Sequence, residues 1–161
     1  MRRKSKRFPV FFIFIVILIA IPTASLLIAN TPYMRVKNDA IRIIQKKTEV
    51  KNFTKYYWYN HNASYFSVLG ENRDQKDQYV IVDTSNGNLL IVDQNKGISE
   101  NDAKKIVLRS ISNANEVRSA RLGIYKKKVV WEDSYFDDHH RLNYYTLDFK
   151  NGEILQKVLD V

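Results

Sequence analysis

Apolar and polar positions divide this chain into one long uncharged run followed by two similar halves. Residues 8–29 contain no charged side chain. Beyond them, the segment NDAIRII at 38–44 is similar to NDAKKIV at 101–107, at an offset of 63 residues. In each segment the apolar residues follow the i, i+3, i+4 spacing of one helix face. Similarity at a fixed offset predicts an internal repeat that begins with an amphipathic helix.

The residues around these segments predict where the two helices start. Ser99 and Asp102 form a capping pattern, so the second helix is expected to begin just after Ser99. The first helix is expected to begin at Thr31, with Pro32 in its first turn, where a missing N–H costs nothing.

Eight β-prone segments follow the helices, four in each half, and turn residues separate them. The last turn of each half contains Asn-Gly, within VDTSNGNLL at 82–90 and LDFKNGEIL at 147–155. Asn-Gly favours a type I′ turn, because both central residues of that turn need positive φ. The expected strands are 53–59, 64–70, 78–83 and 88–93 in the first half, and 117–125, 128–136, 142–149 and 153–159 in the second.

The pattern therefore predicts an α+β protein of two tandem repeats, each with one helix and about four antiparallel strands. We place the first repeat at 31–95 and the second at 97–161, with Gly97 after the first. Because the joining segment is short, two small domains in contact are expected, and not two domains on a long tether.

The uncharged run predicts a transmembrane anchor. As a helix, residues 8–29 would span roughly 33 Å, enough for a hydrocarbon core of about 30 Å. The tail at 1–7 is rich in basic residues, which predicts a cytoplasmic N-terminus with everything after Asn30 outside. A cleaved signal peptide is the alternative, since small residues follow Pro22. The apolar run continues past that site, which favours an uncleaved anchor.

Charge and cysteine content limit the functions of the outer part. The whole chain has a net charge of +9, with 26 basic and 17 acidic residues. Much of this excess lies in the tail, so it indicates membrane topology and gives little support to nucleic-acid binding. The chain has no cysteine, so its folded part has to be stable without disulfides.

Three segments of the second repeat carry a family resemblance. They are KGISENDAKKIV at 96–107, VVWEDSYFDD at 129–138 and YYTLDFKNGEIL at 144–155. A Gly-Ile-Ser helix start, a Trp-Glu strand and an aromatic strand before a Gly-containing turn resemble a PepSY-like domain in content and order. With the anchor in front, the chain is similar to the TseB (YpmB) family of membrane-anchored proteins of Gram-positive bacteria. The first repeat matches more loosely, through its aromatic run.

The resemblance implies PepSY/cystatin-like repeats and a function without catalysis. It implies an extracellular regulator of cell wall elongation that binds a class B penicillin-binding protein. PepSY-type domains are also associated with restraint of exported proteases, so an inhibitory or chaperone-like module is the alternative. No catalytic residue, cofactor, metal, nucleic acid or small-molecule substrate is expected.

The residues themselves are weak candidates for an enzyme. DDHH at 137–140 holds four metal-ligand side chains, but strand neighbours point to opposite faces, so a polar hairpin loop is expected. His61 is expected in the equivalent loop of the first half. Glu132 and Asp133, beside Trp131, could form an acid pair, but they face apart on a strand, and a solvated sheet face is the simpler interpretation.

The aromatic run at 56–59 is the first candidate for a partner surface. On a strand, Tyr56 and Trp58 face one side, and Tyr57 and Tyr59 face the other. One of these faces is expected to be exposed in so small a domain. Tyr and Trp are enriched at the centres of protein interfaces. The alternative is that the neighbouring repeat covers one side.

Basic residues of the first helix are the second candidate. Arg35, Arg42 and Lys46 share a polar helix face near the outer membrane surface, where anionic head groups or wall polymers would meet them. A solvated helix face is the alternative.

Overall fold

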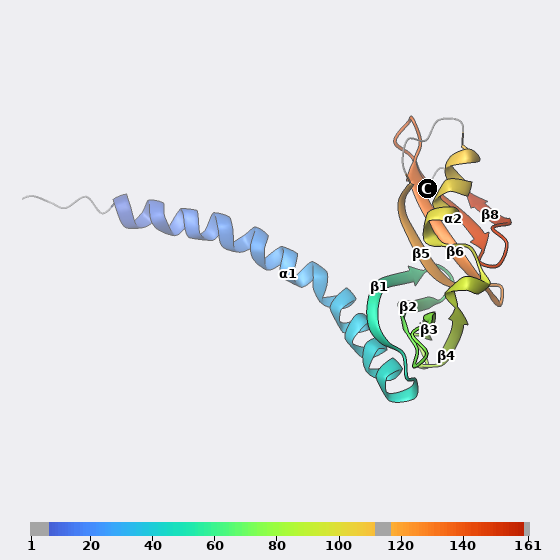
Figure 1. The fold of residues 1–161 in the computed structure, drawn as a ribbon. Coiled ribbons are helices and arrows are strands. Elements are labelled where there is room, and N and C mark those ends of the chain that lie inside the picture. Colours follow the sequence, from blue (N-terminus) through green and yellow to red (C-terminus); the bar gives the residue numbers. More distant parts are fainter. Residues whose placement is uncertain (1–6, 112–116, 160–161) are drawn as a thin grey trace, which may run out of the picture. The chain divides into compact units, whose positions relative to one another are not determined.

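The computed structural model describes the backbone of residues 7–111 and 117–159, and side chains within 12–21, 32–111 and 117–159. The chain divides into two compact units, Met1–Val36 and Lys37–Val161. Helix α1 (Arg7–Lys47) contributes residues to both units, and the described strands belong to the second (Figure 1).

The predicted start of the first helix is wrong. Helix α1 begins at Arg7, and Thr31 and Pro32 lie inside it. A proline removes only its own backbone hydrogen bond and crowds one preceding carbonyl, and the helix-forming residues on both sides outweigh that loss here. The helix ends at Lys47, three residues after the NDAIRII segment.

The first unit, Met1–Val36, contains the predicted anchor. Within the described residues, no helix has the length and apolar character needed to cross a membrane. Most of the predicted tail at 1–7, and the side chains of 8–11 and 22–29, lie outside the described residues. Large apolar side chains of α1, among them Phe12, Phe14 and Leu18, are exposed. The anchor stays a prediction.

Eight strands form two separate four-stranded antiparallel sheets, each with its strands in sequence order. The eight predicted β segments are all confirmed, with ends shifted by no more than two residues. The first sheet contains β1 (Lys51–Asn60), β2 (Ser64–Glu71), β3 (Asp77–Asp83) and β4 (Leu89–Asp93). The 3-10 helix η1 (Gln94–Lys96) and helix α2 (Glu100–Arg109) lead to the second, with β5 (Val117–Tyr125), β6 (Lys128–Phe136), β7 (Leu142–Asp148) and β8 (Ile154–Val158).

The start of α2 is confirmed in atomic detail. Ser99 is the N-cap, and its hydroxyl accepts a hydrogen bond from the amide of Asp102 at 3.1 Å. This bond satisfies one of the backbone donors that a helix start leaves unpaired.

Both halves contain the same contact between a helix and a hairpin. A Cβ placed on Gly87, in the β3–β4 turn, would lie 3.4 Å from Cδ1 of Ile43 in α1. A Cβ placed on Gly152, in the β7–β8 turn, would lie 2.5 Å from Cδ1 of Ile106 in α2. Ile43 and Ile106 are the residues that the offset of 63 relates, so the internal repeat is present in the fold as well as in the sequence.

The two Asn-Gly turns are equivalent, but they are not of type I′. The amide of Gly87 donates to the carbonyl of Asp83 at 2.8 Å, and that of Gly152 donates to Asp148 at 2.9 Å. In each turn only the glycine has positive φ, +70° and +74°. Both aspartate side chains accept the backbone amide two residues ahead, at 2.9 Å. This aspartate cap stabilises a four-residue loop in place of the predicted two-residue turn.

Two successive positive φ angles, as a type I′ turn requires, occur instead between β5 and β6. Lys126 has φ +48° and Lys127 has φ +65°, and the flanking Tyr125 and Lys128 pair directly. The lysines therefore lie at the tip of a tight hairpin between the two predicted strands, although lysine does not favour that turn.

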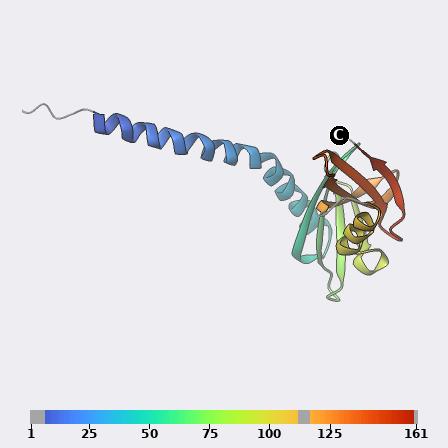
Figure 2. The ribbon, with the colours of Figure 1, turned by 90° about the horizontal axis from the view of Figure 1, so that it is seen from above.

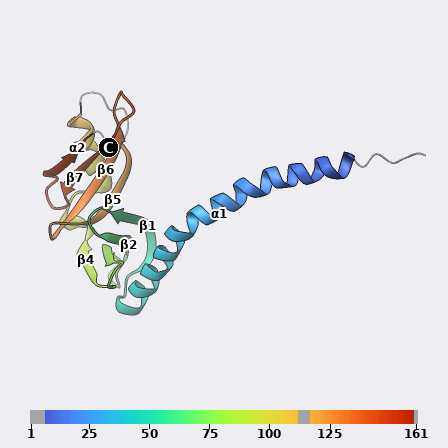
Figure 3. The same cartoon turned by 180° about the vertical axis from the view of Figure 1, so that it is seen from behind.

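The first sheet lies between the end of α1 and the second repeat. Lys47 of α1 donates to the carbonyl of Gly87 at 2.9 Å, which fixes the helix to the β3–β4 turn. Views from above and from behind show the last turns of α1 alongside β1 (Figure 2 and Figure 3). On the other face, Ser67 of β2 donates to the carbonyl of Leu122 in β5 at 2.8 Å.

The two repeats share one hydrophobic core. Trp131 of β6 is fully buried, and its indole N–H donates to the carbonyl of Ile98 at 3.0 Å. Its ring meets Tyr57 of β1 and Tyr79 of β3 edge to face, at centroid distances of 5.2 and 5.7 Å. Residues Lys37–Val161 accordingly form one compact unit. The boundaries at 31–95 and 97–161, as domains, stay a prediction.

Candidate functional site

Strand β1 sends its aromatic residues to opposite faces, as the alternation predicted. Tyr57 and Tyr59 face the second repeat and are 7% and 1% exposed. A Cβ on Gly123 of β5 would lie only 2.2 Å from Cγ of Tyr59, so the two strands approach closely there. Burial raises the pKa of both phenols. The neighbouring repeat covers this side of β1, so most of Tyr57 and nearly all of Tyr59 are buried.

Tyr56 and Trp58 lie on the other face of β1 and are half-buried. The ammonium group of Lys37 lies 3.8 Å from the centre of the Tyr56 ring, within the range of a cation–π contact. The indole N–H of Trp58 donates to the hydroxyl of Ser64 at 3.0 Å. These two residues are the accessible part of the predicted aromatic surface.

A groove of about 480 Å³ follows the line where β1 meets β5. Each of these strands is the edge of its own sheet, and no ladder of hydrogen bonds joins them. Aromatic and arginine side chains, which are enriched at protein interfaces, therefore meet along two sheet edges. The lining residues are Tyr56, Tyr57, Trp58, Asn60, Ser119, Ala120 and Arg121. We call this surface the β1–β5 groove and take it as the candidate functional site.

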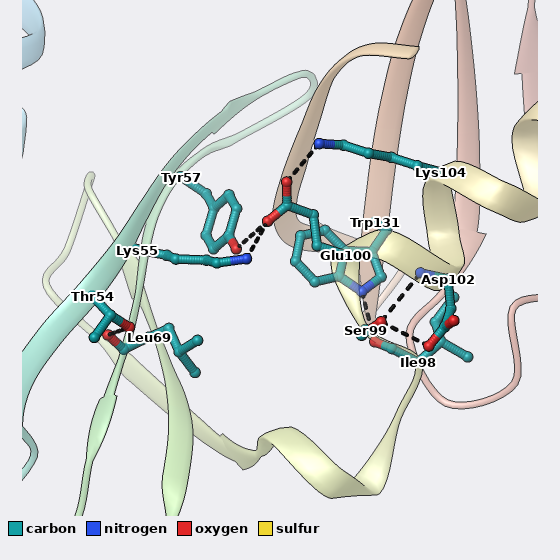
Figure 4. A network of polar contacts seen from close by, with 10 residues as sticks. All are labelled: Thr54, Lys55, Tyr57, Leu69, Ile98, Ser99, Glu100, Asp102, Lys104 and Trp131. Atoms are coloured by element: carbon teal, nitrogen blue, oxygen red, sulfur yellow. Dashed lines mark hydrogen bonds and ion pairs between the residues drawn. The ribbon is translucent and has the colours of Figure 1, made fainter. Parts of the chain in front are cut away.

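A polar network centred on Glu100 of α2 fixes β1 from its buried side (Figure 4). The Glu100 carboxylate receives Lys55 at 2.8 Å, Lys104 at 2.7 Å and the hydroxyl of Tyr57 at 2.9 Å. Burial raises the pKa of this carboxyl, but the three hydrogen bonds outweigh burial and lower it to about 2. Glu100 is thus ionised at neutral pH and ties the second repeat to the aromatic strand.

The sequence contained one local sign of this network. Glu100 and Lys104 are four residues apart on a helix with the acid first, which is the favoured order for an ion pair. The contacts of Glu100 with Lys55 and Tyr57 join residues far apart in the chain, and they could not be derived from local spacing.

The prediction of a solvated face for Glu132 and Asp133 is wrong. The two residues do point to opposite faces of β6, but they are only 3% and 0% exposed, because neighbouring elements cover both faces. Glu132 meets His61 at 3.4 Å and Arg121 at 3.8 Å. Burial raises the pKa of Glu132, while these two basic side chains oppose the rise. Since Arg121 also lines the β1–β5 groove, Glu132 helps to position that lining.

Asp133 has no partner of this kind. Neither oxygen of its carboxyl group has a hydrogen bond to the described part of the chain. Burial raises its pKa to about 7, with Lys104 opposing the rise and Glu100 adding to it. An acid pair is not formed with Glu132, because the two groups lie on opposite sides of the strand.

The DDHH segment forms the polar hairpin loop that was predicted. Asp137 accepts the amides of His139 and Arg141, both at 2.9 Å, and the carbonyl of Asp137 accepts the amide of His140 at 3.0 Å. Among the residues described, no group of three or more His, Cys, Asp or Glu side chains could hold a metal ion. His61 is not in the equivalent loop: it lies in the β1–β2 turn, which corresponds to the β5–β6 turn.

The basic candidates on α1 are exposed. Arg42 and Lys46 are one helix turn apart in the second unit, and Arg42 meets Asp39 at 3.6 Å. Arg35 belongs to the first unit and is exposed there. Exposure fits both a membrane-facing role and a solvated face, so their proposed contact with the membrane surface stays a prediction.

The chain is similar to known proteins in one segment of its sequence and in its fold. The family described as "Cell wall elongation regulator TseB-like domain" matches residues 39–83, which lie in the first repeat and not in the second, where the resemblance was more specific. The solved structure of the YpmB protein from Bacillus subtilis is similar in fold, with a TM-score of 0.65 and 23% identity over 76% of this chain and 95% of that one. No curated protein matches the chain. The segment that contains the aromatic strand is thus similar to a TseB-like domain, and the chain is similar in fold to YpmB, in agreement with the family resemblance found in the sequence.

Proposed function

We propose that this protein is a membrane-anchored, extracellular regulator of cell wall elongation that binds a class B penicillin-binding protein and performs no catalysis. The observation that carries the proposal is the TseB-like domain at residues 39–83, whose family is described as a cell wall elongation regulator. The anchor, the location and the identity of the partner are what we add to that description.

The β1–β5 groove is the surface that we propose for the partner. Tyr56, Trp58 and Asn60 lie in the family-matched segment, and Arg121 comes from the second repeat. A partner in this groove would contact both repeats at once. This surface exists only when the two repeats are docked, so neither repeat alone would offer it to a partner.

The groove is held rigid before a partner arrives. Lys37 stacks on Tyr56 from one side of β1, while Glu100 binds Lys55 and Tyr57 from the other. A surface ordered in advance loses less conformational entropy on binding, so more of the contact energy appears as affinity.

The proposed anchor is the run at 8–29. Exposed Phe12, Phe14 and Leu18 show that α1 carries large apolar side chains that nothing in the described part of its own unit covers. A helix that is apolar on all sides is typical of a membrane span. Five basic residues in the tail at 1–7 support a cytoplasmic N-terminus and extracellular repeats.

Photo-crosslinking in living cells tests the proposal. A photoreactive amino acid replaces Asn60, which is exposed and lines the groove, and in a matched control it replaces Lys76, which is exposed in the β2–β3 turn. We expect mass spectrometry to identify a class B penicillin-binding protein at position 60 and not at 76. Recovery of an exported protease at position 60 would support the PepSY-type inhibitory function instead.

A further inference from the structure

A second groove, of about 610 Å³, runs along β4. Strand β4 is the edge of the first sheet opposite β1, so this surface is separate from the β1–β5 groove. Leu90 and Ile91 of β4 are 39% and 42% exposed, which is unusual for large apolar side chains in this unit. Val129 of β6 and the buried Phe149 complete an apolar lining. We call this surface the β4 groove.

Lysines surround the β4 groove in excess of acidic residues. Lys128 meets Asp148 at 2.9 Å, and Asp93 accepts a hydrogen bond from the side chain of Gln78 at 2.7 Å, so both acids have partners. The remaining lysines of the lining form no ion pair with any described residue, which leaves the groove electropositive. These lysines are Lys96, Lys127 and Lys150.

The backbone of β4 is open to pairing along one side. Its described ladder partners all belong to β3, from Leu89 opposite Val82 to Asp93 opposite Gln78. An edge strand with exposed apolar residues is a template on which another extended chain can add. Lysines beside such an edge repel a second basic edge, so a second copy of this chain is a poor occupant.

We propose that the β4 groove binds an extended, acidic segment of another protein, which adds to the first sheet as a strand beside β4. Its carboxylates meet Lys96, Lys127 and Lys150, and its apolar side chains lie beside Ile91, on the opposite face of the strand from Leu90. The volume of the groove is within the range of about 300–1,000 Å³ that is common for ligand sites. This site is independent of the partner proposed for the β1–β5 groove.

A simple polyanion would use only part of this surface. Phosphate groups or lipid head groups would meet the lysines but would leave the β4 edge unpaired and Ile91 exposed. An acidic peptide with alternating apolar residues satisfies the charge, the apolar lining and the open backbone edge together, which is why we choose it over an anionic polymer or membrane.

Fluorescence anisotropy on the full chain in neutral detergent micelles tests this inference. The probe is a labelled peptide of alternating Glu and Val, and the control probe alternates Lys and Val. We expect the acidic peptide to bind at least about tenfold more tightly. In a strand, every second backbone N–H points to the same neighbour, so only one set of peptide amides, those of Glu or those of Val, would donate to β4. N-methylation of that set should abolish binding, and N-methylation of the other set should not.

Variants of the protein locate the site. Lys127→Glu with Lys150→Glu should weaken binding of the acidic peptide about tenfold or more, since two attractions become repulsions. The matched pair Lys51→Glu with Lys76→Glu makes the same charge change at exposed positions outside the groove and should leave affinity within about twofold. Ile91→Thr should weaken binding without any change of charge. Thermal unfolding of each variant shows that folding is retained.

Several results would overturn the inference. These are no binding of the acidic peptide, equal binding of the basic peptide, or undiminished binding of both N-methylated peptides. If Ile91→Thr has no effect while polyphosphate or phosphatidylglycerol vesicles displace the peptide, the groove is a general anion surface and not a strand-binding site.

Discussion

Asp133 carries a buried carboxyl group that no described residue stabilises by a hydrogen bond. Burial raises its pKa to about 7, whereas the same group in the unfolded chain has a pKa near 4. Between these two values the folded protein holds a proton that the unfolded chain has lost. The free energy of unfolding therefore falls as pH rises from about 4 to about 7, because the carboxyl group has to lose its proton in a buried site that disfavours the charged form.

Replacing Asp133 by Asn should remove this penalty. We expect Asp133→Asn to match the native protein near pH 4 and to exceed its free energy of unfolding at pH 8 by up to about 4 kcal/mol, the value of three pKa units. Urea unfolding, followed by tryptophan fluorescence between pH 4 and pH 8, measures the difference. A variant less stable than the native protein at pH 8 would show that the carboxylate has a stabilising partner.

Glu100 should show the opposite pH dependence. Its pKa is lowered to about 2 in the fold, so it adds stability above its unfolded pKa and loses that contribution as pH falls through the folded value. Glu100→Gln should therefore lower the free energy of unfolding at pH 7, with the deficit shrinking in strong acid. The same urea series measures it, and a deficit that is independent of pH would contradict an ionic role for Glu100.

At the scale of elements, the two glycine turns offer a matched comparison. Gly87 and Gly152 both have positive φ, so an alanine is strained at either, by roughly 1–2 kcal/mol. An alanine at Gly152 also places its Cβ 2.5 Å from Cδ1 of Ile106, whereas at Gly87 the nearest atom is 3.4 Å away.

We therefore expect Gly152→Ala to destabilise the fold more than Gly87→Ala, by about 1 kcal/mol or more. Adding Ile106→Val to Gly152→Ala removes the crowded methyl group and should restore part of the difference. Thermal or urea unfolding of the three variants provides the measurement. Equal losses at the two glycines would mean that α2 is not packed on its hairpin as described.

The secondary structure was predictable from the sequence, but the contacts between elements largely were not. Strands followed from alternation and from turn residues, which are local signals. The type I′ assignment failed because Asp83 and Asp148 cap a longer loop, and the helix start failed because Pro32 does not interrupt α1. In the two turns an aspartate cap outweighed a dipeptide preference, and in α1 the helix-forming residues on both sides of Pro32 outweighed its missing hydrogen bond.

The candidate site shows the same division. Alternation correctly grouped Tyr56 with Trp58 and Tyr57 with Tyr59, but docking of the second repeat decided which pair is buried. Burial of Glu132 and Asp133 likewise depends on elements that cover both faces of β6. No local pattern contains that information, because it comes from residues far away in the chain.

For the whole molecule, the anchor and its orientation are testable in cells. Protease added to cells without their wall should degrade the region after Asn30, and the intact protein should remain in the membrane fraction, because residues 8–29 are expected to span the bilayer. Immunoblotting of fractions measures both. A soluble mature form that begins near Leu26 would show that the segment is a cleaved signal peptide instead.

The most direct test of the central claim is a pull-down of the class B penicillin-binding protein from detergent-solubilised membranes. Asn60→Arg blocks the β1–β5 groove without removing a core side chain, and Trp58→Ala removes its largest contact. If Trp58 is a hot spot, its loss should weaken the binding free energy by about 2 kcal/mol or more, and recovery of the partner should fall accordingly. The control, His139→Ala with His140→Ala, changes an exposed loop and should leave recovery nearly intact, with thermal unfolding recorded for every variant.

The expected result is loss of the penicillin-binding protein from both groove variants while the folded state persists and the histidine control behaves as the native chain. Unchanged recovery with Asn60→Arg and with Trp58→Ala would contradict binding at this groove. Loss of recovery in the histidine variant alone would instead point to a role for the loop at 137–140.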